Sequence, residues 1–146
     1  MLRELLTNAT VRVNVEVKNW EDAIRKGGEL LTQDGAAEQS YVDAMVDSVK
    51  KFGPYMVIAP GIAMPHARPD AGAKRLGMSL LTLKNPVEFG NKVNDPVYIV
   101  VCLAATDHTT HICVMRELVG ILADSKKMDK IRSAKNLEEV LCLLQE

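Results

Sequence analysis

The stretch VYIVVCLAA occupies residues 97–105 and contains no charged side chain. An uninterrupted apolar run of this length is typical of a strand that is buried on both faces at the centre of a sheet. Thr106 and Asp107 follow directly, and His111, Met115 and Leu118 then recur at helical spacing. The sequence therefore predicts a central buried strand that leads straight into a helix.

Other strands and helices alternate around this central segment. Residues 11–18 alternate between apolar and polar side chains, which indicates a half-buried strand, and residues 77–83 indicate another. Helical patterns occupy residues 20–31, 41–52, 125–135 and 137–144. This mixture predicts a single α/β domain over residues 1–146, with a small mixed sheet and helices on both of its faces.

Three of these helices have recognisable starts. Asn19 with Asp22, Ser40 with Asp43, and Asn136 with Glu139 have the three-residue spacing of a capping box. Gly27 and Gly28 interrupt the first helix at a cost of about 1 kcal/mol each. We expect another backbone to approach this helix closely at the two glycines. The aromatic ring of Phe52 falls on the apolar stripe of the second helix.

The composition excludes several classes of protein. The 146 residues include 18 Lys and Arg against 19 Asp and Glu, whereas proteins that coat nucleic acid are usually strongly basic. The three cysteines have no C-x-x-C spacing, so we expect free thiols and a cytoplasmic protein. There is no apolar run of membrane-spanning length, and no nucleotide-binding, zinc-protease or nucleophile-elbow motif.

The most unusual local segment is PGIAMPHARP, residues 60–69. Its three prolines restrict the backbone and predict a stiff, non-helical loop that holds His66 in one direction. Arg68 adds a planar set of donors suited to an oxyanion such as phosphate. The alternative is an ordinary histidine in a proline-rich turn.

A second group of polar residues follows the central strand. Asp107, His108 and His111 lie where a buried strand meets a helix, which is a common ligand site in α/β sheets. The first turn of that helix also favours an anion. The alternatives are a core histidine at His111, and an exposed or capping residue at His108.

Two chemistries are open if His66 and His111 converge. The histidines, with Asp107, could bind zinc as in a catalytic zinc site. Alternatively, neutral His66 could accept a phosphoryl group on nitrogen while His111 and Arg68 stabilise its oxygens. The residue types alone leave both chemistries possible.

The motif GIAMPHA at residues 61–67, together with the later His111 and its aliphatic neighbours, resembles the fructose/mannitol-type IIA family. This family belongs to the bacterial phosphoenolpyruvate-dependent sugar phosphotransferase system. The run HARPDAG at residues 66–72 looks most like the ascorbate-type branch. The order of the expected elements is similar over nearly the whole chain.

The resemblance implies a cytoplasmic phosphocarrier that needs no metal or cofactor. His66 would accept a phosphoryl group from HPr and pass it to a cysteine of a IIB protein, while a membrane IIC component imports the sugar, here L-ascorbate. His111 would be the second active-site histidine. His108 is kept as an accessory candidate because it lies three residues before His111 on the same helix. Mannitol-type relatives carry an arginine late in the helix before this loop, where residues 47–50 here read DSVK. Lys50 or Arg68 would replace it, and we favour Arg68.

Two alternatives differ from transport. Domains of the resembled family also act as regulatory sensors whose phosphorylation state sets partner binding, and a zinc hydrolase could use the same histidines. A relay needs a shallow docking surface for two partners. We expect Ile62, Met64 and the apolar end of the His111 helix to form it, unless Met64 is simply part of the core.

Overall fold

The central strand predicted by the sequence is confirmed. In the computed structural model, which describes residues 2–145, β5 (Val97–Ala104) is the middle strand of a five-stranded sheet. The strand order is β1-β4-β5-β3-β2, with β1 (Val11–Val15), β2 (Val57–Ala59), β3 (Ile62–Ala63) and β4 (Gly77–Val87). The sheet is mixed, because β5 pairs antiparallel with β4 and parallel with β3.

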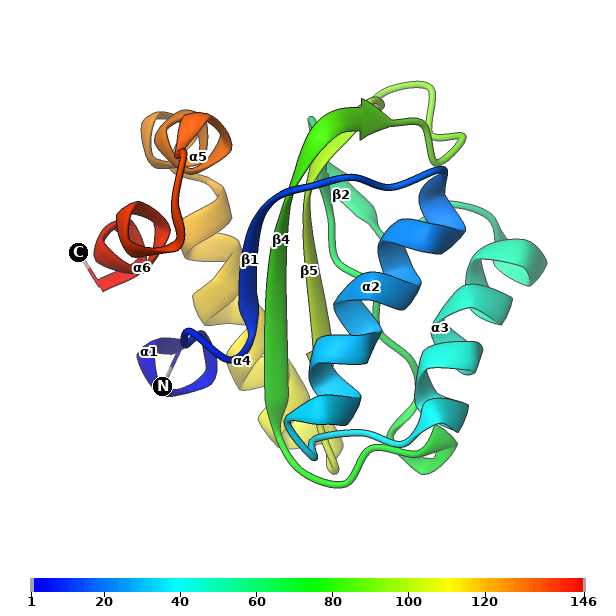
Figure 1. Ribbon diagram of the computed structural model, residues 1–146. Coiled ribbons are helices and arrows are strands. Elements are labelled where there is room, and N and C mark those ends of the chain that lie inside the picture. Colours follow the sequence, from blue (N-terminus) through cyan, green and yellow to red (C-terminus); the bar gives the residue numbers. More distant parts are fainter. Residues whose placement is uncertain (1, 146) are drawn as a thin grey trace.

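Helices cover both faces of this sheet, as Figure 1 shows. On one face lie α2 (Trp20–Gln33) and α3 (Gln39–Phe52). On the other face lie α1 (Leu2–Leu5), α4 (His108–Leu122), α5 (Ser125–Ser133) and α6 (Leu137–Gln145). A short 3₁₀ turn, η1 (Pro69–Ala71), follows the His66 loop. The expected α/β class and the placement of the helices are therefore confirmed.

The two faces of β5 belong to two separate apolar cores. Val100 and Cys102 pack with the α2–α3 layer, where Tyr41 and Met45 are fully buried. The alternate residues Ile99, Val101 and Leu103 pack in the other core, toward the layer that contains α4. Burial on both sides explains why the sequence of this strand carries no charge.

The helix starts agree with the sequence in two cases out of three. Asn19 Oδ1 accepts a hydrogen bond of 2.9 Å from the Asp22 amide, and Asn136 Oδ1 accepts one of 3.0 Å from the Glu139 amide. The predicted capping box at Ser40 is wrong. Helix α3 begins two residues earlier than expected, at Gln39 after the N-cap Glu38, and the Ser40 hydroxyl donates instead to the Ala71 carbonyl at 2.9 Å.

The two glycines of α2 do allow close packing, but against side chains rather than another backbone. A β-carbon at position 27 would lie 2.6 Å from Cys102 Sγ. One at position 28 would lie 2.6 Å from Val42 Cγ1. Gly27 thus brings α2 onto β5, and Gly28 brings it onto α3.

Candidate active site around His66

The parallel pairing of β3 and β5 places two histidines side by side. Both strands end at the same edge of the sheet, and the Leu103 amide donates to the Pro65 carbonyl at 3.0 Å. The chain after β3 carries His66, and the chain after β5 enters α4, which carries His111. The two imidazole rings lie with their centroids 5.3 Å apart and their planes at 49°. The convergence on which both candidate chemistries depend is therefore present.

The orientation of the His66 ring is set by its own loop. Its Nδ1 lies 2.9 Å from the carbonyl oxygen of Met64. Because a carbonyl can only accept, Nδ1 must carry the hydrogen, and the neutral ring then has its lone pair on Nε2. The half-buried His66 ring is therefore held in the tautomer whose other nitrogen is nucleophilic.

His111 differs from His66 in its surroundings. Burial lowers the pKa of His111, and the neighbouring His66 and His108 lower it further. Its Nε2 atom is buried and has no hydrogen-bond partner within residues 2–145. Buried ring nitrogens usually make a hydrogen bond, and this one does not. The Nε2 atom of His111 is therefore available to accept or donate one hydrogen bond to a bound group.

Both rings line a pocket of about 300 Å³. Three further lining residues come from the end of α3 and the turn after it: Ser48, Phe52 and Tyr55. The ring of Tyr55 meets His66 edge-on at 6.0 Å between centroids. The other lining residues are Ala67, Arg68, Pro69 and His108.

Sequence reasoning missed the aromatic side of this pocket. Phe52 was expected in the core, yet 67% of it is exposed, and Tyr55 is 50% exposed. Phe52 is the last residue of α3, so the helical stripe no longer decides which way its side chain points. A cluster of Phe52 and Tyr55 beside the Gly53-Pro54 break was the available signal.

The two candidate cations lie in different places. Arg68 lines the pocket, has a largely exposed side chain and pairs with Asp70 at 3.7 Å. Lys50 instead pairs with Glu21 of α2 at 3.2 Å and is not part of the pocket lining. His108 also lines the pocket and is exposed.

The arrangement gives little support to the zinc alternative. Asp107 is the N-cap of α4, where one carboxylate oxygen accepts from the Thr110 amide at 2.7 Å and the other from the Thr110 hydroxyl at 2.8 Å. Within residues 2–145, no three His, Cys, Asp or Glu side chains are grouped so that they could hold a metal ion.

The comparison with known protein families decides the assignment. Residues 4–146 match the model of the family described as "Phosphoenolpyruvate-dependent sugar phosphotransferase system, EIIA 2". The chain belongs to this EIIA family.

Individual EIIA relatives agree with this assignment. The chain is 42% identical over 141 residues to the ascorbate-specific PTS system EIIA component of Escherichia coli K12, covering 96% of this chain and 92% of the relative. The corresponding component of Shigella dysenteriae matches with the same identity and coverage. As an EIIA component, the chain is part of a phosphotransferase system.

Solved structures of EIIA proteins share the fold. The mannitol-specific cryptic enzyme IIA CmtB of E. coli is 29% identical and superposes with a TM-score of 0.89, covering 98% of this chain and 97% of CmtB. The E. coli mannitol IIA protein, solved in a complex with phosphorylated IIB, is 27% identical with a TM-score of 0.84, covering 97% and 99%.

The surface of this EIIA domain corrects one expectation. Ile62 and Met64 are only 3% and 1% exposed, so they belong to the core and do not form a docking patch. The exposed apolar side chains near the pocket are those of Phe52 and Tyr55, and Ile112 and Val119 are exposed on α4.

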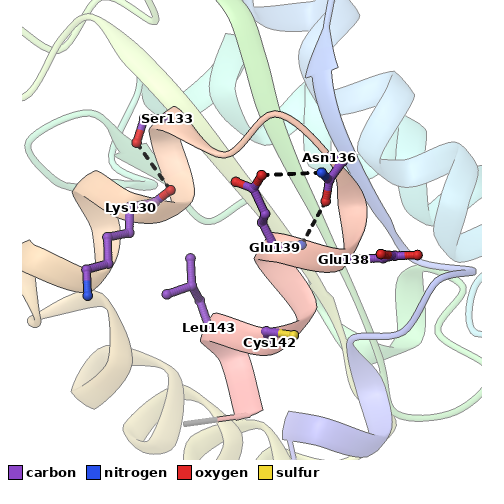
Figure 2. Close-up of a pocket in the computed structure, with 7 residues that line it drawn as sticks. All are labelled: Lys130, Ser133, Asn136, Glu138, Glu139, Cys142 and Leu143. Carbon is purple, nitrogen blue, oxygen red and sulfur yellow. Dashed lines mark hydrogen bonds between the residues drawn. The ribbon is translucent and has the colours of Figure 1, made fainter.

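A larger hollow lies elsewhere on the EIIA domain. It has a volume of about 560 Å³ and lies between α5 and α6, as Figure 2 shows. None of its lining residues is a histidine: they are Lys130, Ser133, Asn136, Glu138, Glu139, Cys142 and Leu143. No helix within residues 2–145 is both long and apolar enough to cross a membrane.

Proposed function

We propose that this chain is a cytoplasmic phosphocarrier that accepts a phosphoryl group on His66 from phospho-HPr and passes it to a cysteine of a IIB protein. The sugar taken up through the membrane IIC component would be L-ascorbate. The observation that carries the proposal is the orientation of the His66 ring. Its Nδ1–H donates a hydrogen bond to the Met64 carbonyl, which leaves Nε2 as the nucleophile.

The transfer needs only an exchange of bonds to phosphorus. The Nε2 lone pair attacks phosphorus while the bond to the donor atom of HPr breaks. In the second step a thiolate sulfur of IIB attacks, and the N–P bond breaks. The imidazole gains positive character as Nε2 bonds to phosphorus. The hydrogen bond from Nδ1–H to the Met64 carbonyl stabilises this form of the ring.

The pocket supplies groups that suit the phosphoryl oxygens. The lowered pKa of His111 favours a neutral ring in the unphosphorylated protein, and a neutral ring can still donate a hydrogen bond to a phosphoryl oxygen. Arg68 supplies the charge. Its exposed pair with Asp70 is weak, which leaves the guanidinium free to turn toward the phosphoryl group. His108 also lines the pocket and is an accessory hydrogen-bond donor.

Two kinds of similarity support the sugar and the acceptor. Relatives that are 42% identical are named as ascorbate-specific components. The mannitol IIA protein, which shares this fold, has been solved together with phosphorylated IIB. We therefore propose a IIB protein as the acceptor of the phosphoryl group from His66 in this chain.

The test is phosphorylation of the purified protein by phosphoenolpyruvate, enzyme I and HPr, followed by mass spectrometry. We expect one acid-labile phosphoryl group at His66 and none in His66→Ala. The chain has three histidines, so labelling of His108 or His111 in the variant would contradict the proposal. Onward transfer to an ascorbate-type IIB protein, compared with a mannitol-type one, tests the sugar.

A further inference from the structure

The hydroxyl of Tyr41 lies behind the His66 loop, at the meeting point of α3, β5 and the loop itself. Tyr41 is fully buried. Its hydroxyl donates to the Leu103 carbonyl at 2.7 Å and accepts from the Ala67 amide at 3.0 Å. The Ala67 carbonyl lies 3.2 Å away. One side chain thus joins the residue after His66 to the end of the central strand.

The rest of the loop is held at its two ends. The Pro65 carbonyl accepts from the Leu103 amide at 3.0 Å, which fixes the beginning of the loop to β5. The Ser40 hydroxyl donates to the Ala71 carbonyl at 2.9 Å, and the Glu38 amide donates to the Gly72 carbonyl at 2.8 Å. These bonds fix the end of the loop to the start of α3. Between them, Tyr41 holds the residue next to the nucleophile.

The phenol is suited to this task because it both donates and accepts. Burial raises the pKa of Tyr41 to about 12, so the hydroxyl keeps its proton at any pH near neutrality. A phenylalanine would fill the same space but would leave the Leu103 carbonyl unpaired in the core and the partly buried Ala67 amide without its partner. Unpaired buried groups favour a rearrangement of the segment that carries them.

We propose that Tyr41 is a positioning residue for the phosphoryl transfer. By fixing Ala67 to the end of β5, its hydroxyl keeps His66 close to Met64, so that Nδ1 keeps its hydrogen bond and Nε2 faces the pocket. Tyr41 itself does not touch the phosphoryl group. The effect on transfer rate rests on the proposed function, whereas the effect on the His66 ring does not.

The test compares Tyr41→Phe with Tyr98→Phe. Tyr98 is a second tyrosine, on β5, whose hydroxyl makes no hydrogen bond within residues 2–145. Two readouts are needed: the ¹⁵N shifts of the His66 ring, which report its tautomer, and single-turnover phosphorylation over a range of phospho-HPr concentrations. In Tyr41→Phe we expect a mixture of His66 tautomers and a maximal rate about tenfold lower, with the half-saturating HPr concentration unchanged. Tyr98→Phe should match the wild type in both.

Two results would overturn the proposal. A folded Tyr41→Phe protein with wild-type ring shifts and a wild-type maximal rate, even if it melts at a lower temperature, would mean that Tyr41 is only structural. A changed half-saturating concentration at an unchanged maximal rate would point to docking instead.

A further measurement covers a variant that does not fold. In the wild-type protein the Ala67 amide should exchange with solvent as slowly as amides of the central strand, because it is bonded to a buried hydroxyl. Exchange at the rate of an open loop would refute the positioning role. If the wild type is not phosphorylated by HPr, the proposed function fails, while ring shifts and amide exchange still decide the role of Tyr41.

Discussion

Arg68 and Lys50 are the two cations that could stabilise a phosphoryl group on His66, and only Arg68 lies at the pocket among these two. We expect Arg68→Gln to slow phosphoryl acceptance by about tenfold to a hundredfold. This is less than the roughly hundredfold to thousandfold loss for one preorganised oxyanion donor, because the Arg68 side chain is largely exposed. Rapid-quench phosphorylation by phospho-HPr measures this rate.

Lys50→Gln is the matched control for this prediction. It removes a positive charge of α3 that is paired with Glu21, and should leave the rate unchanged. The reverse result, a slow Lys50→Gln and a normal Arg68→Gln, would mean that Lys50 leaves Glu21 and serves the phosphoryl group.

A second prediction at the scale of one residue concerns how His111 affects the pH dependence of the free energy of unfolding. Its pKa is lowered by folding, mainly through burial and then through the charges of His66 and His108. Between the unfolded pKa of about 6.5 and the lower folded value, the unfolded chain binds more protons than the folded one. The free energy of unfolding should therefore fall as the pH drops below about 6.5.

Urea unfolding of the wild type and His111→Gln at pH 7.5 and 5.5 measures this effect. Glutamine does not titrate, so the variant should lose less stability than the wild type over this interval. The interval lies above the usual carboxylate pKa range, which keeps Asp and Glu out of the comparison. Equal losses in the two proteins would show that His111 does not contribute to the pH dependence.

At the scale of an element, replacing a glycine by alanine should have opposite effects on stability in α2 and in α4. In α2, a β-carbon at Gly27 would lie 2.6 Å from the sulfur of the fully buried Cys102. Overpacking of this kind costs about 1–3 kcal/mol. In α4, Gly120 has open space around it, so Gly120→Ala should stabilise by about 0.5–1 kcal/mol through helix propensity.

Chemical denaturation of Gly27→Ala, Gly120→Ala and the double variant Gly27→Ala/Cys102→Ala separates these effects. The double variant removes the sulfur that the new methyl group meets, so part of the loss in Gly27→Ala should be restored. An undiminished loss in the double variant would mean that α2 is held close to the sheet by contacts other than Cys102.

The elements also show how far the sequence could be interpreted. Residues 97–105 identified the central strand because an uncharged strand has to be buried on both sides. Asn19 identified a helix start because an N-cap is decided within four residues. Ser40 did not mark a helix start, because its hydroxyl donates a hydrogen bond to the carbonyl of Ala71, which is distant in sequence and near only in the fold.

The site was predictable in part for the same reason. His66 was visible from the prolines around it, whereas its proximity to His111 was only a condition of the proposed chemistries, because it depends on the parallel pairing of β3 with β5. The sequence left the burial of Met64 open, and the helical stripe placed Phe52 wrongly, because each depends on which neighbours the sheet and α3 bring to that position. Likewise, nothing in the local sequence shows that Tyr41 contacts Ala67.

At the scale of the whole molecule, the pocket lies where the two helical layers meet at one edge of the sheet. Ser48 and Phe52 come from α3, on one face, whereas His108 and His111 come from α4, on the other (Figure 1). The His66 loop lies between the two layers. A protein that reaches His66 must therefore contact both layers, and the exposed rings of Phe52 and Tyr55 offer apolar area for this contact.

Phe52→Ser tests this role in docking. Because 67% of Phe52 is exposed, the free energy of unfolding should change by no more than about 0.5 kcal/mol. Loss of an aromatic anchor should raise the half-saturating concentration of HPr, and of IIB, about tenfold, while the maximal transfer rate stays the same. Val93→Ser is the matched control, since Val93 is 85% exposed and does not line the pocket. A lower maximal rate at an unchanged half-saturating concentration would instead assign Phe52 to the chemistry of the pocket, because a ring used only for docking cannot affect transfer once the partner is bound.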